Sequence, residues 1–244
     1  MIRDSKIPFA YDKELLEGYR LKQYLYWDYT LFPNLLVLGN SGSGKSYLLR
    51  LILGHISATF ISGGELTTAK AWIADYKNEI LSVSAMRFYG YKDTLRGFDE
   101  FYSAFEARLS HEDSERSFQL LVIDEYVSWL ASMDKKEAEE IKKRMATLLF
   151  MVRSLNMHVI LGCQRGMAEN FSFGSRDCLN VIFLGAPSRE SVHSFVDKEA
   201  ADVMKPCVRG QGYACFDGKQ PQAFIVPKVT NFDEINAAIM QLVN

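Results

Sequence analysis

The chain has 244 residues, of which 48% are hydrophobic and 24% are charged, and its formal net charge is -2. This is the composition of an ordinary globular protein, and it excludes a disordered protein and a strongly acidic or basic one. The total charge provides no attraction for nucleic acid. Any contact with DNA must therefore come from a local basic patch or from several copies acting together.

The sequence shows no pattern of a zinc site, a redox motif or a membrane segment. The four cysteines form no CxxC pair, so we expect reduced, small core residues at Cys163, Cys178, Cys207 and Cys215. Charges interrupt the first twenty residues, where a signal peptide needs an apolar stretch, and no run approaches about 18 apolar residues. We therefore predict a cytoplasmic protein without a membrane span, which reaches a membrane only through a partner.

Apolar runs of strand length alternate with helical patterns along the chain. In chain order, strands are predicted at residues 24–29 (an edge strand), 34–39, 58–62, 70–76, 86–89, 119–123, 158–163 and 180–185. The clearest helices are predicted at 46–53, 135–155 and 233–242, and a hairpin at 212–216 and 223–226 around Asp217-Gly218. This alternation predicts an α/β fold whose mainly parallel central sheet is flanked by helices, with a C-terminal β-hairpin. We divide the chain into an N-terminal extension, 1–23, and a single domain, 24–244.

Residues 39–46, GNSGSGKS, match the phosphate-binding motif GxxxxGK[ST] between a predicted strand and a predicted helix. Glycines let successive backbone N–H groups point at phosphate oxygens, and the helix start adds its positive dipole end. Lys45 would reach the β- and γ-phosphates of ATP, and Ser46 would bind Mg2+. The alternative is a glycine-rich turn that binds nothing. The predicted nucleotide contacts are Gly39, Asn40, Ser41, Gly42, Ser43, Gly44, Lys45, Ser46 and Tyr47.

Two adjacent carboxylates, Asp124 and Glu125, follow the apolar run Leu120–Ile123. In P-loop folds, ligands gather at the carboxyl ends of such strands. Asp124 would hold Mg2+, and Glu125 would act as general base for the attacking water. The alternative is an ordinary strand end with solvated acids.

Gln164 ends another predicted buried strand at the same edge of the sheet. Its amide can accept a hydrogen bond from the attacking water and donate one to a phosphate oxygen, so it could sense the γ-phosphate. A capped strand end is an equally good interpretation.

The order of the P-loop, LLVIDEY at 120–126 and MVRSLNMHVILGCQR at 151–165 resembles the motor domain of the FtsK/HerA superfamily of DNA-pumping ATPases. It is also similar to the coupling ATPases of conjugative elements. The resemblance continues through residues 179–184 and 188–191 to the GRG-like segment Val208-Arg209-Gly210, and it covers about residues 24–243. It implies a RecA-like P-loop NTPase fold.

The resemblance further implies a homohexameric ring threaded by double-stranded DNA, with ATP bound between subunits. Arg153 precedes Gln164 by eleven residues, a spacing similar to that of the trans-acting arginine and the sensor glutamine of coupling ATPases. We therefore nominate Arg153 as an arginine finger that stabilises charge on the γ-phosphoryl oxygens. The alternative is an arginine that complements a helix dipole. Arg165 and Arg209 are the reserve candidates.

Two further segments resemble parts of the same motors. Asp75-Tyr76-Lys77 looks like the strand-end Asp-x-Lys of the family, and we assign it no role. The segment 133–136 resembles a pore-facing one, which nominates Lys135 and Lys136 for DNA phosphate contacts, with more basic residues at 142–144. Glutamates surround them, so the alternative is a solvated helix face. Six copies in a ring would multiply the few contacts of each subunit.

The chain lacks the winged-helix module, the long linker and the membrane helices of full-length chromosome translocases, so we do not expect sequence-directed movement. It resembles a stripped motor of a mobile element or virus. We predict an ATP-hydrolysing DNA translocase for transfer, packaging or segregation of a mobile genome, with a membrane-complex, nuclease or relaxase partner. One alternative is an assembly or protein-remodelling ATPase that does not grip DNA, and another is a slow nucleotide-dependent switch.

Overall fold

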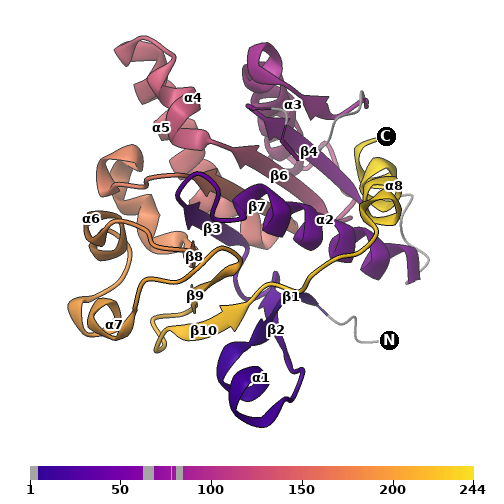
Figure 1. The fold of residues 1–244 in the computed structure, drawn as a ribbon. Coiled ribbons are helices and arrows are strands. Elements are labelled where there is room, and N and C mark those ends of the chain that lie inside the picture. Colours follow the sequence, from indigo (N-terminus) through magenta and orange to yellow (C-terminus); the bar gives the residue numbers. More distant parts are fainter. Residues whose placement is uncertain (1–4, 63–68, 78, 81–84) are drawn as a thin grey trace.

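The computed structural model describes residues 5–62, 69–77, 79–80 and 85–244 (Figure 1). Within these residues one ten-stranded sheet has the order β2-β1-β10-β9-β8-β3-β7-β6-β4-β5. The strands are β1 (Lys6–Asp12), β2 (Tyr24–Asp28), β3 (Asn34–Gly39), β4 (Lys70–Asp75), β5 (Phe88–Tyr89), β6 (Gln119–Asp124), β7 (Met157–Cys163), β8 (Asn180–Leu184), β9 (Gln211–Cys215) and β10 (Gln222–Ile225). The helices are α1 (Lys13–Tyr19), α2 (Lys45–Ser62), α3 (Thr94–Leu109), α4 (Tyr126–Ala131), α5 (Lys135–Met151), α6 (Arg189–His193), α7 (Lys198–Val203) and α8 (Phe232–Val243).

The six strands from β8 to β5 in this order pair in parallel, and the strands on the other side of β8 pair antiparallel. Every residue of β3, β6 and β7 is buried, as expected for strands that helices cover on both faces. The predicted α/β fold with a mainly parallel sheet is confirmed. Its consequence for function is that the carboxyl ends of β3, β4, β6 and β7 meet at one edge.

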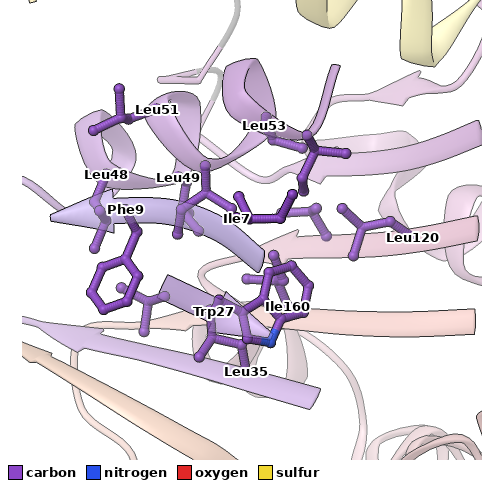
Figure 2. Packing of buried hydrophobic residues seen from close by; sticks show 14 of the residues in the cluster. Ile7, Phe9, Trp27, Leu35, Leu48, Leu49, Leu51, Leu53, Leu120 and Ile160 are labelled. Atoms are coloured by element: carbon purple, nitrogen blue, oxygen red, sulfur yellow. The ribbon is translucent and has the colours of Figure 1, made fainter. Parts of the chain in front are cut away.

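Two apolar layers lie on the two faces of the sheet, because neighbouring residues of a strand point to opposite faces. Figure 2 shows the first layer, in which leucines of α2 pack onto Leu35 of β3 and Ile160 of β7; α8 belongs to the same layer. The second layer joins Leu36 and Leu38 of β3 to α3, α4 and α5. The P-loop helix is thus anchored on one face and the helices that follow β6 on the other.

The strand predicted at 58–62 is wrong, because these residues continue helix α2. Ile52, Ile56 and Phe60 recur every four residues and are 0%, 0% and 4% exposed, so they form one buried helical face. A short apolar run with β-branched residues does not by itself distinguish a strand from a buried helix. The helix predicted at 46–53 begins correctly but continues to Ser62, so its predicted end is wrong. The remaining predicted strands and helices are found within about two residues of their expected ends, although residues 152–155 form a 3-10 turn after α5.

Residues 6–12, which we placed in an N-terminal extension, form β1 between β2 and β10. Ile7 and Phe9 of this strand are fully buried and pack with Trp27 of β2 (Figure 2). Residues 6–12 of the extension are therefore built into the sheet, and residues 13–19 form helix α1 beside it. The division into an extension and one domain stays a prediction.

The remaining sequence expectations concern small features. Asp217 and Gly218 both have positive φ, and the Lys219 amide donates to the Phe216 carbonyl at 3.1 Å, which is the predicted hairpin turn. The four cysteines are free, but only Cys163 and Cys215 are buried, so the expectation of core cysteines is wrong for the half-buried Cys178 and Cys207. No helix in the described part of the chain is long and apolar enough to cross a membrane.

Candidate nucleotide-binding site

The P-loop connects β3 to α2 in a conformation that glycine makes accessible. Gly42 and Gly44 have φ values of 78° and 103°, and a side chain at Gly39 would overlap the Ser43 hydroxyl. The Ser43 carbonyl accepts from the Gly210 amide at 3.0 Å, so the start of β9 braces the loop. Helix α2 begins at Lys45, which directs its N-terminus at the loop.

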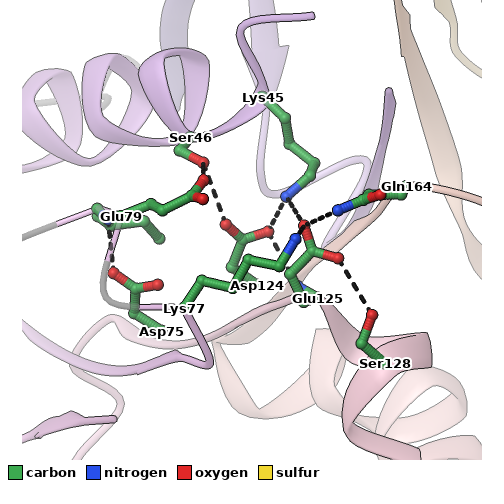
Figure 3. A network of polar contacts seen from close by, with 10 residues as sticks. Lys45, Ser46, Asp75, Lys77, Glu79, Asp124, Glu125, Ser128 and Gln164 are labelled. Atoms are coloured by element: carbon green, nitrogen blue, oxygen red, sulfur yellow. Dashed lines mark hydrogen bonds and ion pairs between the residues drawn. The ribbon is translucent and has the colours of Figure 1, made fainter. Parts of the chain in front are cut away.

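Asp124 and Glu125 lie at the end of β6 beside this loop, and both are buried. Lys45 Nζ contacts Asp124 Oδ1 and lies 3.0 Å from Glu125 Oε1 (Figure 3). On the neighbouring strand β7, a side chain at Gly162 would overlap Asp124 Oδ1. The glycine of β7 therefore makes room for the carboxylate of β6.

Gln164 reaches the same carboxylates from the end of β7. Its Nε2 donates to Glu125 Oε1 at 3.1 Å, while the Ser128 hydroxyl of α4 donates to Glu125 Oε2 at 3.3 Å. Glu125 itself has a φ of 62° and connects β6 to α4. The structure thus brings together Lys45, Asp124, Glu125 and Gln164, which the sequence nominated from three separate segments.

The charges in this cluster stabilise one another. Burial alone would raise the pKa of Glu125, but the charge and hydrogen bonds of Lys45, with Gln164 and Lys77, hold it below its usual range. Burial alone would lower the pKa of Lys45, but Asp124 and Glu125 raise it. Both groups are therefore charged at neutral pH, as the roles predicted for Lys45 in phosphate binding and for Glu125 in base catalysis require.

A cavity of about 270 Å³ opens in front of these residues. Seven of the nine predicted nucleotide contacts line it, namely Asn40, Ser41, Gly42, Gly44, Lys45, Ser46 and Tyr47. The lining also includes Arg50, Lys77, Glu79, Glu125, Gln164 and Arg209. Gly39 and Ser43 lie behind it, where they shape the loop.

The oxygen atoms around the Ser46 hydroxyl fit Mg2+. Ser46 Oγ lies 3.4 Å from Asp124 Oδ2 and 3.1 Å from Glu79 Oε2. Hydroxyl and carboxylate oxygens are the ligands that Mg2+ prefers, and it usually keeps water and phosphate ligands as well. Across the described residues, no cluster of three or more His, Cys, Asp and Glu side chains could hold a metal. A magnesium ion here would therefore depend on Ser46, Asp124 and the nucleotide itself.

The three nominated arginines lie in different places. Arg153 is exposed on the 3-10 turn before β7, at the opposite end of this strand from Gln164. Seven residues of strand span about 23 Å, so Arg153 cannot reach the cavity of its own chain. Arg209 lines that cavity, and Arg165 is exposed beside Gln164.

Lys135 and Lys136 are exposed on the first turn of α5, whose capping box is formed by Asp134 and Glu137. Of the basic residues further along this helix, Lys142 pairs with Glu139 at 2.9 Å. Arg144 is bound to α3, where it pairs with Asp99 and stacks on two aromatic rings. Arg144 is therefore a structural residue, and the candidate DNA surface is smaller than the sequence indicated.

Sequence reasoning missed three residues that line the cavity. Arg50 stacks over the Phe232 ring at 4.1 Å and donates to Asn236 Oδ1 at 2.7 Å, which ties α2 to α8; no sequence signal marks it. Lys77 and Glu79 come from the segment after β4. The Asp-x-Lys resemblance was the signal for Lys77, because β4 lies beside β6 and their ends coincide.

A strand–P-loop–helix unit, a neighbouring strand that ends in two carboxylates and a parallel sheet between helices define the fold of P-loop ATPases. No family model matches the chain. An FtsK domain-containing protein of Bacillus subtilis (strain 168), YdcQ, is 27% identical over 206 residues, which cover 80% of this chain and 43% of that protein. The chain therefore spans less than half the length of this relative.

Solved structures agree with the fold. The conjugation coupling protein TcpA of pCW3 superposes with a TM-score of 0.72 at 16% identity, over 99% of this chain and 71% of that one. The cytoplasmic domain of the type VII secretion ATPase EccC of Thermomonospora curvata has a TM-score of 0.66 at 22% identity, over 93% of this chain and 26% of that one. The fold is RecA-like, and the resemblance to the FtsK/HerA superfamily is confirmed.

Proposed function

We propose that this chain is an ATPase of the FtsK/HerA type that hydrolyses Mg2+-ATP and uses the cycle to move double-stranded DNA. One observation carries the enzymatic part: Lys45, Glu125 and Gln164 converge on one cavity from the P-loop, β6 and β7, and Asp124 contacts Lys45 directly beneath it. A protein that only binds nucleotide does not need a buried, ionised glutamate beside the metal-binding carboxylate.

The chemistry follows from the placement of these groups. Lys45 and the P-loop amides would hold the β- and γ-phosphates, and Ser46 and Asp124 would hold Mg2+, which neutralises charge on the phosphate oxygens when it is bound. Glu125 would accept a proton from the attacking water. The oxygen of this water would bond to the γ-phosphorus while the bond between the γ-phosphorus and the β–γ bridging oxygen breaks and ADP leaves. Gln164 would orient this water.

The position of Arg153 supports a ring. Arg153 is exposed and lies too far from the nucleotide cavity of its own chain, but it could reach the cavity of a neighbouring copy. A head-to-tail contact that closes on itself would set the Arg153 edge of one subunit over the cavity of the next. We propose a homohexamer in which Arg153 acts in trans. Lys135 and Lys136 would contact DNA phosphates, and the ring would work in the cytoplasm, docked at a membrane complex or with a nuclease or relaxase.

The DNA cargo is supported by the FtsK-domain relative and by the likeness to a conjugation coupling protein. A second candidate is a protein-handling ATPase, which the likeness to EccC supports. One structural observation favours it: the cavity that Lys136 and Lys143 line is also lined by four acidic side chains, Asp134, Glu137, Glu139 and Glu140, which would repel phosphates.

A Glu125→Gln variant tests the enzymatic part. It should bind ATP as the wild type does but hydrolyse it at least about 100-fold more slowly, because the general base is lost. Bound nucleotide, identified after gel filtration, should be ATP in the variant and ADP in the wild type. Glu115→Gln, at an exposed glutamate, is the matched control. Equal hydrolysis by wild type and Glu125→Gln would refute the role of Glu125 and favour a slow switch.

A further inference from the structure

We propose that Lys77 is a positioning residue for hydrolysis: it holds the Glu125 carboxylate in place once Lys45 has turned to the phosphates of the nucleotide. This inference rests on the proposed ATPase function and assigns a role to a residue outside the P-loop and the β6 carboxylates. Lys77 Nζ lies 3.1 Å from Glu125 Oε1, and Lys77 lines the nucleotide cavity (Figure 3).

The sheet explains how Lys77 comes to this position. Strands β4 and β6 pair in parallel with Asp75 opposite Asp124, so the residues that follow each strand meet at the same edge. Asp75 is fully buried, and its Oδ2 accepts from the Ile80 amide at 2.5 Å. This hydrogen bond ties the end of β4 to the segment beyond Lys77.

Glu79, in the same segment, accepts from the Ser46 hydroxyl at 3.1 Å. The segment after β4 therefore contacts the nucleotide site at two points, with Lys77 at the general base and Glu79 at the P-loop helix. Two independent contacts hold the segment against the site, so the position of Lys77 beside Glu125 is defined by more than one flexible side chain.

Glu125 Oε1 has three donors at nearly equal distances: Lys45 at 3.0 Å, Lys77 at 3.1 Å and Gln164 at 3.1 Å. Lys45 cannot serve both this oxygen and the phosphates. When it leaves, the Glu125 side chain, which is 3% exposed, keeps the ion pair with Lys77, its other cationic partner among the described residues. A buried carboxylate without a cation is strongly destabilised, so the ion pair with Lys77 keeps the Glu125 side chain directed into the cavity.

Lys77 is suited to this task by its exposure. Its side chain is 36% exposed, so it reaches the carboxylate from the rim of the cavity on a flexible stem and can follow small movements of Glu125. The same exposure means that its replacement should not unfold the chain. A competing interpretation is that Lys77 binds the γ-phosphate directly, and the two are separable by measurement.

The test compares Lys77→Met and Lys77→Arg with the wild type, and Lys92→Met, at an exposed lysine outside the cavity, is the matched control. Lys77→Met should lower kcat by about 100-fold, the cost of misplacing a catalytic group. Its affinity for a fluorescent, non-hydrolysable ATP analogue should stay within about threefold of wild type. Lys77→Arg should recover most of kcat.

A double-mutant cycle shows whether Lys77 acts through Glu125. In a Glu125→Gln background, Lys77→Met should lower kcat little further, because the carboxylate that Lys77 positions is gone. Three results would each overturn the proposal. Lys77→Met could lower kcat as much in the Glu125→Gln background as in the wild type. Lys77→Met alone could lose as much affinity for the analogue as it loses in kcat, or it could leave kcat unchanged. A wild type without turnover would instead refute the proposed function, and the role of Lys77 with it.

Discussion

Replacement of Lys45 by methionine should destabilise the nucleotide-free chain as well as abolish hydrolysis. The Lys45 side chain is 6% exposed, and its two acidic partners, Asp124 and Glu125, are 0% and 3% exposed. Methionine is close to lysine in volume but leaves Asp124 without the cationic partner that it has among the described residues, while Glu125 keeps its ion pair with Lys77. One buried charge then lacks its partner.

The size of the effect follows from these distances. At 3.0 Å and an effective dielectric constant of about 20, one ion pair is worth about 5 kcal/mol before desolvation. Breaking a buried pair by removing one partner costs about 3 to 5 kcal/mol in measured cases. Since Lys77 offsets part of the charge, we expect Lys45→Met to lower the free energy of unfolding by about 3 kcal/mol.

Urea unfolding at pH 7 without nucleotide measures this change, with Lys92→Met as the control. The double variant Lys45→Met/Asp124→Asn should recover part of the loss, because it removes the charge that Lys45 leaves unpaired. Attraction to Lys45 keeps the pKa of Glu125 below its ordinary value of 4.5, against the effect of burial. Without Lys45 the Glu125 carboxylate protonates more readily, so the deficit of the variant should shrink as the pH falls toward 4. A Lys45→Met chain within about 0.5 kcal/mol of wild type would refute the buried ion cluster.

Three further outcomes are expected. Burial, with a smaller effect of Arg108, lowers the pKa of His158 to about 3, so between pH 6.5 and 3 the unfolded chain binds a proton at His158 and the folded chain does not. The free energy of unfolding should therefore fall by about 1.4 kcal/mol per pH unit below 6.5. In urea titrations at pH 7, 6 and 5, His158→Phe should lose this contribution to the pH dependence of stability. An unchanged slope would contradict this. Gly162→Ala should cost about 1 to 3 kcal/mol of stability and lower kcat, because the new methyl group overlaps Asp124 Oδ1; normal turnover would show that Asp124 tolerates displacement. Arg153→Ala and Lys45→Ala should each be inactive alone, but their mixture should hydrolyse ATP, since an intact P-loop then meets an intact Arg153 from a neighbour; an inactive mixture of two folded variants would exclude the trans role.

Motifs that combine a local pattern with a strand end could be placed from the sequence. The P-loop and the Asp124-Glu125 pair were predicted in their correct elements, because strand, turn and helix signals agree there. Gln164 was predicted at the correct edge for the same reason. The strand predicted at 58–62 was wrong, because the helical pattern of this run can be recognised only when Phe60 is taken together with Ile52 and Ile56.

The sequence could not predict the distances between residues that lie far apart along the chain. Lys77 stands 48 residues before Glu125, and only the register of β4 against β6 brings them to 3.1 Å. Arg144 was grouped with the DNA-facing lysines, but packing directs it to Asp99 and the aromatic rings of α3. In both cases tertiary contacts, and not local pattern, decide the role of the side chain.

A DNA-moving ATPase is tested most directly by the ATP turnover of the purified chain, with and without linear double-stranded DNA, at about 50 and 200 mM salt. Lys45→Ala, checked for folding, is the blank. We expect turnover that DNA stimulates at low salt and stimulates less at the higher salt, because phosphate contacts release counterions. ATP turnover that is the same with and without DNA at both salt concentrations would contradict the DNA cargo and favour a protein substrate. Turnover no higher than that of Lys45→Ala would contradict the ATPase itself.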